Sequence, residues 1–170
     1  MPNVARFARA LFALHQEDLL KHPACKEPVT LFIRKATEEQ HWHNKAHYRS
    51  RAAAAVIAAA TIRSEAAYQK FCVRNLRHEH MVPNAVIYKL ILQQGDITIE
   101  RLQQLLSTLG RRATITRAQD ALLPQASMPA EFYTSGDPMY MNPLARYEAA
   151  GIAGDLDELT ATSWYVHDRR

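Results

Sequence analysis

The chain has 170 residues and a mass of 19.3 kDa, which favours a single compact domain with its own core. Hydrophobic residues make up 48% of the chain and charged residues 22%, a balance that excludes a mostly disordered protein. The longest uncharged run, residues 52–62, is too short to span a bilayer, and two cysteines are too few for a disulfide framework. We therefore expect a cytoplasmic protein with no membrane partner.

Charge is distributed unevenly along the chain. Residues 1–80 contain 13 lysines and arginines against 7 aspartates and glutamates, a net charge of +6, and also 7 of the 8 histidines. Residues 81–170 contain 8 basic against 10 acidic residues, a net charge of −2. A basic half of this kind indicates a surface for nucleic acid or another anionic partner, although a solvated, arginine-rich helical surface would have the same composition.

The first half of the chain predicts helices. Apolar side chains recur at helical spacing over residues 4–19. Residues 29–33 are short, apolar and β-branched, which fits either a strand or a helical turn. From Thr37, which begins a capping-box pattern, to about Leu76 the chain contains no proline or glycine, and residues 52–60 include seven alanines. We therefore expect one long, alanine-rich helix at the centre of the fold.

Proline and glycine divide the second half into shorter elements. Pro83 excludes a helix interior just before it, and short helices are expected over residues 84–94 and 98–109, each closed by the glycine that follows. Residues 112–115 are expected to be extended at most. A capping box then opens a helical turn or two over residues 117–123.

The fold class that follows is mostly α. About six or seven helices, including a short one over residues 144–150, are expected to pack on the alanine-rich helix in a compact single domain over residues 1–154. The β structure is expected to be at most a small two-stranded element near residues 29–33 and 112–115. Residues 155–170 are interpreted as an acidic, aromatic C-terminal tail.

The segment His78-Glu79-His80, which precedes Pro83, is the strongest candidate for chemistry. A carboxylate beside an imidazole can fix its tautomer and raise its basicity, as a general base acting on water requires. The alternative is a structural hinge in which Glu79 pairs with Arg77 or Arg74. The sequence leaves both interpretations open.

A second histidine pair, His43 and His47, has the spacing that lets two imidazoles on one helix face bind one metal ion. No third ligand is evident nearby in the sequence. An exposed, weakly basic helix start is therefore the alternative interpretation of this pair.

Residues 79–83 resemble the acidic-His-x-x-Pro start of HNH-type (ββα-metal) endonucleases. The resemblance implies that His80 is the general base and that Glu79 orients it or binds the metal. It also implies Asp120 and His78 as ligands of a divalent Mg²⁺, Mn²⁺ or Zn²⁺ ion. The chain departs from the family in lacking its glycine pair, central asparagine and zinc-binding cysteines.

A longer pattern is similar to that of a group of small, functionally uncharacterised bacterial proteins. It runs from Glu79-His80-x-x-Pro83 through Thr116-x-x-x-Asp120-x-x-Leu123 to Arg146-Tyr147-x-x-x-Gly151-Ile152. The resemblance covers residues 75–152 and implies a shared fold, but it implies no activity.

Five arginines are candidate phosphate contacts, because guanidinium groups bind phosphate in a fork geometry. They are Arg74, Arg77, Arg111, Arg112 and Arg117. They form one surface only if the segments that carry them pack together.

Two functional hypotheses follow. The first, which we favour, is a small binding protein of a bacterial defence, immunity or mobile-element (phage, anti-defence) system that acts on nucleic acid or on a complex that processes it. The second is an HNH-like, metal-dependent endonuclease with His80 as general base. The sequence names neither the partner nor the oligomeric state.

Overall fold

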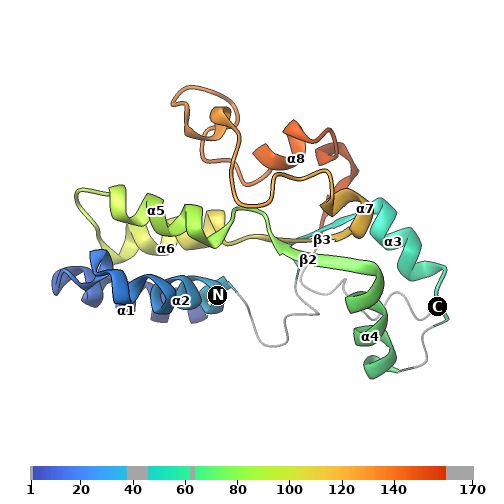
Figure 1. Ribbon diagram of the computed structural model, residues 1–170, viewed down its shortest axis with the longest axis horizontal. Helices are drawn as coiled ribbons and strands as arrows, with labels where there is room; N and C mark the ends of the chain where they lie inside the picture. The colour runs from blue at the N-terminus through green and yellow to red at the C-terminus, as the bar shows by residue number, and fades with distance from the viewer. Residues whose placement is uncertain (1, 38–45, 62–63, 160–170) are drawn as a thin grey trace.

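The structure is a computed structural model that describes residues 2–37, 46–61 and 64–159 (Figure 1). A helical half and a half built on a β-sheet lie side by side along the longest axis of the molecule. The helices are α1 (Pro2–Gln16), α2 (Lys26–Thr37), α3 (Arg51–Ala58), α4 (Glu65–Asn75), α5 (Asn84–Gln93), α6 (Ile99–Leu109), α7 (Arg117–Asp120) and α8 (Ala145–Ala149). The strands are β1 (Tyr48–Ser50), β2 (Leu76–His80), β3 (Arg112–Thr116) and β4 (Leu156–Glu158). Short 3-10 turns are η1 (Leu19–Lys21), η2 (Pro23–Cys25), η3 (Ala130–Tyr133) and η4 (Ala153–Asp155).

Helices α1, α2, α5 and α6 form the helical half around a shared apolar core (Figure 1). The buried leucines of α6 recur at the spacing of one helix face, which turns that face toward α1 and α5. Thr98 caps α6 by accepting a hydrogen bond from the Arg101 backbone N–H at 3.2 Å. The Tyr88 hydroxyl of α5 donates to the Leu20 carbonyl at 2.7 Å and ties the turn after α1 to the core.

The sheet has the strand order β2-β3-β1-β4, with β1 parallel to β3 and the two outer pairs antiparallel. Strands β2 and β3 are neighbours although α5 and α6 lie between them in the chain, so the sheet leads directly into the helical half (Figure 1). The register pairs His78 with Thr114 and Glu79 with Ala113. Helix α8 covers one face of the sheet, and α4 packs on the other side at Leu76 (Figure 1).

The expectation of a mostly α fold with at most a two-stranded β element is wrong, because the chain builds a four-stranded mixed sheet. Of the two segments expected to be extended, 112–115 lies within β3, whereas 29–33 lies within α2. Strand β3 pairs instead with β1 and β2. Short strands are stabilised by partners that are distant in the chain, so local sequence carries little sign of them.

The alanine-rich segment also differs from the expectation of one long central helix over residues 37–76. Helix α2 ends at Thr37, β1 occupies part of the expected helix, and two shorter helices, α3 and α4, follow. Ser50 caps α3 and Ser64 caps α4, each by accepting a hydrogen bond from the backbone N–H three residues later. The pairing of β1 with β3 and β4 outweighs the helix propensity of the residues around it.

Elements that depend on local signals are confirmed. Helices α5, α6 and α8 lie within two residues of the predicted ranges. The predicted capping box is present: Thr116 Oγ1 accepts from the Gln119 N–H at 3.2 Å, and Gln119 Oε1 accepts from the Thr116 N–H at 3.1 Å. Strand β4 lies in the segment interpreted as a tail. No helix in the described ranges combines the length and apolar character needed to cross a membrane.

Candidate functional site

The predicted site residues of β2 divide between the two faces of the sheet, because successive side chains of a strand point in opposite directions. Arg77 and Glu79 lie on the side of α8, which we call the α8 face. His78 and His80 lie on the opposite side, together with the residues that pair with them in β3, and we call this the histidine face. Glu79 and the two histidines beside it in the sequence therefore lie on opposite faces of the sheet.

On the α8 face, Glu79 is held by α8. Its Oε1 accepts a hydrogen bond from the Tyr147 hydroxyl at 2.5 Å, and its Oε2 pairs with Arg146 Nη2 at 3.1 Å. Neither of the arginines that the sequence offered as its hinge partner makes this pair. The carboxylate is directed at α8 and away from the His80 side chain.

Arg146 stabilises the bend that follows β2. Its side chain is 2% exposed, and it donates to the carbonyls of His80 at 3.0 Å, Met81 at 3.2 Å and Pro124 at 2.9 Å. The segment around Glu79 and the segment around Arg146, which begin and end the longer sequence pattern, are therefore in direct contact. This contact supports the hinge interpretation of the segment.

Burial determines the electrostatics of this cluster. Burial raises the pKa of Glu79 above its ordinary value of 4.5, although the Arg146 charge and the Tyr147 hydrogen bond act in the opposite direction. Burial and the nearby carboxylate also raise the pKa of the Tyr147 phenol. Tyr147 therefore stays neutral and donates a hydrogen bond to Glu79.

Asp120 lies at the other end of β2 from His80. Its Oδ2 pairs with Arg77 Nε at 3.1 Å, beside the start of the strand. In the parts of the chain that the structure describes, no three His, Cys, Asp or Glu side chains are grouped as a metal site. The structure does not bring Asp120, His78 and His80 together as the resemblance to HNH enzymes implied.

The histidine face contains polar and basic residues from three strands. His78 Nδ1 lies 2.7 Å from Thr114 Oγ1, and Thr114 is in register with Arg49 of β1. His80 is in register with Arg112, whose side chain is buried at 3% exposure. This predicted phosphate contact is therefore not on an open surface.

His47 belongs to the end of the sheet and not to a helix. Its Nδ1 accepts a hydrogen bond from the Arg112 backbone N–H at 3.1 Å, which leaves the proton of a neutral ring on Nε2. Its predicted metal-binding partner, His43, lies outside the described residues. Because a helix was expected over this segment, the positions of His47 and Arg49 at the sheet were not predicted. Nothing in the local sequence pattern signals a strand there.

The five predicted phosphate-binding arginines separate into two groups. Arg111 and Arg112 lie at one end of β3, where Arg111 Nη1 bonds to the Tyr48 hydroxyl at 2.6 Å and to Glu158 at 3.1 Å. Arg74, Arg77 and Arg117 lie at the other end, one strand length or about 13 Å away.

The second group forms an exposed basic surface. Arg117 donates from Nε to the Arg74 carbonyl at 2.6 Å and from Nη2 to the Val73 carbonyl at 2.8 Å, which caps the last turn of α4. Lys70 lies one turn earlier on the same helix and is exposed. We call Lys70, Arg74, Arg77 and Arg117 the α4–α7 basic patch.

Comparison with protein-family models, with curated proteins and with solved structures finds no match to this chain. Functional inference therefore depends on the geometry of these sites.

Proposed function

We propose that the protein binds nucleic acid through the α4–α7 basic patch and acts as a binding protein on nucleic acid or on a complex that processes it. The observation that supports this most is the position of Arg117, which lies against the end of α4 next to Arg74. Two distant segments of the chain thereby contribute cations to one exposed surface. Phosphate groups are the natural partners of such a surface, because guanidinium and ammonium groups donate several hydrogen bonds to them.

The charge of the patch is only partly neutralised. Asp120 pairs with Arg77, whose side chain remains 44% exposed. Across residues 2–37, 46–61 and 64–159, no carboxylate pairs with Lys70, Arg74 or Arg117. Three cations are thus available to phosphates, and contacts to phosphates alone carry no sequence information. We expect binding that is strongly salt-dependent and independent of base sequence.

Fluorescence anisotropy with labelled duplex and single-stranded oligonucleotides over a salt series tests the proposal. For a duplex, the slope of log K against log salt is about −0.9 per neutralised phosphate, so three contacts give a slope of about −3. Lys70→Gln and Arg74→Gln are the informative variants, since neither side chain donates a hydrogen bond to another described residue. Each should weaken binding to all sequences and reduce the slope by about 1.

Arg9→Gln is the matched control, because Arg9 is exposed on α1 in the other half of the molecule. It should leave both the affinity and the slope unchanged. Absence of binding by the unmodified chain, or equal losses in the control and the patch variants, would refute the proposal.

The alternative function, a metal-dependent endonuclease with His80 as general base, stays a prediction from the sequence. The same oligonucleotides incubated with Mg²⁺, Mn²⁺ or Zn²⁺ test it, with His80→Ala as the comparison. Cleavage that depends on both the metal ion and His80 would replace binding without catalysis as the conclusion.

A further inference from the structure

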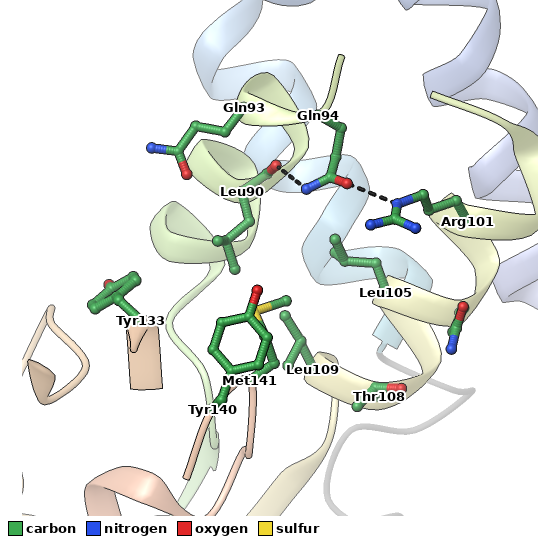
Figure 2. Close-up of a pocket in the computed structure, with 11 residues that line it drawn as sticks. Leu90, Gln93, Gln94, Arg101, Leu105, Thr108, Leu109, Tyr133, Tyr140 and Met141 are labelled. Atoms are coloured by element: carbon green, nitrogen blue, oxygen red, sulfur yellow. Dashed lines mark hydrogen bonds between the residues drawn. The ribbon is translucent and has the colours of Figure 1, made fainter. Parts of the chain in front are cut away.

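A cavity of about 550 Å³ lies between α5, α6 and the segment that follows η3 (Figure 2). This volume is within the range of sites that bind small molecules, about 300–1,000 Å³. The residues that line the cavity belong to α5, α6 and the segment from Tyr133 to Met141, and α5 and α6 lie away from α4 and α7 (Figure 1). The cavity is therefore separate from the α4–α7 basic patch.

The walls of the cavity suit a flat ring. Leu90 of α5 and Leu105 and Leu109 of α6 supply an apolar floor. Tyr140 stands between the two helices with its hydroxyl directed toward Gln94, and Tyr133 lies to one side (Figure 2). Both tyrosines are about half exposed, at 48% and 50%, which is unusual for large aromatic side chains that line a cavity. The Tyr133 ring already packs at right angles to Phe132, with the ring centroids 5.1 Å apart, so the half-exposed Tyr140 is the ring that a ligand can stack on.

Arg101 places a positive charge at the same cavity. Its Nε donates to Gln94 Oε1 at 2.8 Å, and Gln94 Nε2 donates in turn to the Leu90 carbonyl at 3.3 Å, so the guanidinium group is held by α5 (Figure 2). No carboxylate among the described residues pairs with Arg101. The two Nη groups are left to bind an anionic group of a ligand.

The loop that closes the cavity contains a strained residue. Met141 lines the cavity and has a backbone φ of 53°, in the left-handed region that non-glycine residues rarely adopt. Its N–H donates to the Phe132 carbonyl at 3.0 Å, which fixes this conformation. Such strain is concentrated at functional sites, where it holds side chains in place for a ligand.

We propose that this cavity binds a nucleotide, with the base stacked on Tyr140 over the leucine floor and the phosphate at Arg101. The amides of Gln93 and Gln104, which also line the cavity, offer both donors and acceptors of the kind that read the edge of a base. The shared chemistry is a heteroaromatic base joined to a phosphate. Its source is either a free nucleotide or an unstacked residue at the end of a single strand.

The experiment follows the methyl resonances of the full chain labelled with [¹³C-methyl]methionine. It uses titrations with AMP, GMP, CMP and UMP, with the corresponding nucleosides, and with a 5′-phosphorylated single-stranded tetranucleotide. The methyl resonance of Met141 should shift in a saturable way, whereas that of Met81, which is fully buried beside the sheet, should not shift. A Met141→Leu variant assigns the resonance. Tighter binding of the tetranucleotide than of any mononucleotide identifies a strand end as the source, and the reverse identifies the free nucleotide.

The variants test the two halves of the ligand separately. The monophosphate should bind about tenfold or more tightly than its nucleoside, and Arg101→Gln should abolish this preference. Tyr140→Ala should lower the affinity for both the monophosphate and the nucleoside by about tenfold. Arg9→Gln should change neither, and the thermal midpoint of every variant shows that it remains folded. Arg74→Gln separates this site from the basic patch, since it should leave mononucleotide binding intact. No saturable shift of Met141 with any of these ligands, or a preference for the monophosphate that survives Arg101→Gln, overturns the proposal.

Discussion

Replacement of Arg146 by methionine removes the contacts that hold the bend after β2 while preserving most of the side-chain volume. The guanidinium group is 2% exposed and bonds to the carbonyls of His80, Met81 and Pro124 as well as to the Glu79 carboxylate. Loss of one partner of a buried ion pair costs about 3–5 kcal/mol, because the other charge stays buried without compensation. This is about a fifth or more of the stability of a typical domain, about 5–15 kcal/mol.

The cost should depend on pH. Without Arg146, the pKa of Glu79 rises further, so the carboxyl group can take up a proton and relieve the penalty in mildly acidic solution. We therefore expect the destabilisation to be smaller at about pH 5 than at about pH 8.

Urea unfolding followed by far-UV circular dichroism measures the effect, with unchanged m values as the condition for comparison. Arg9→Met on the exposed side of α1 is the matched control and should cost less than about 0.5 kcal/mol. The double variant Arg146→Met with Glu79→Gln should cost less than the sum of the two single variants. A loss below about 1 kcal/mol for Arg146→Met, or strict additivity in the double variant, would show that this contact does not hold the bend.

Three further predictions concern stability. Because burial raises the pKa of Glu79, the contribution of this carboxyl group to the free energy of unfolding is fully present below pH 4.5 and is lost as the pH rises through the folded-state pKa. Glu79→Gln lacks this titration, so its urea midpoint should fall less than that of the unmodified chain between pH 4.5 and the folded-state pKa. Phe132→Ala should cost about 3–5 kcal/mol in urea unfolding, because the side chain is completely buried in the helical core, and a much smaller loss would mean that the loop it anchors is not part of that core. Thr98→Ala should cost about 1 kcal/mol through loss of the cap of α6, whereas Thr98→Ser, which keeps the hydroxyl, should lower the thermal midpoint far less.

Several helices were predictable because their signals are local. The start of α6 at Thr98, the capping box at Thr116 and the end of α8 at Gly151, with its φ of 69°, each depend on residues within one turn of the boundary. The alanine-rich segment was not predictable in the same way. Serine at a helix start and serine inside a helix look alike in sequence, and Ser50 acts as a cap only because it is also the last residue of β1.

The candidate site likewise combines features that local sequence predicts with features that only the fold determines. The sequence identified Glu79, His78 and His80 as residues with unusual chemistry, but it placed them in one cluster. The strand conformation of β2 turns Glu79 toward α8 and the histidines toward the opposite face. The two groups of arginines likewise follow from the antiparallel pairing of β2 with β3, which no property of the individual residues reveals.

Composition, caps and the spacing of apolar residues thus determined a helical, basic chain and the positions of its later helices, because these properties arise from interactions within a few residues. Only the tertiary structure decided the four-stranded sheet, the partners of Glu79, the α4–α7 basic patch and the cavity beside Arg101. Each of these joins segments that are distant in the chain, and the free energy that brings them together comes from packing and hydrogen bonds that exist only after the chain has folded.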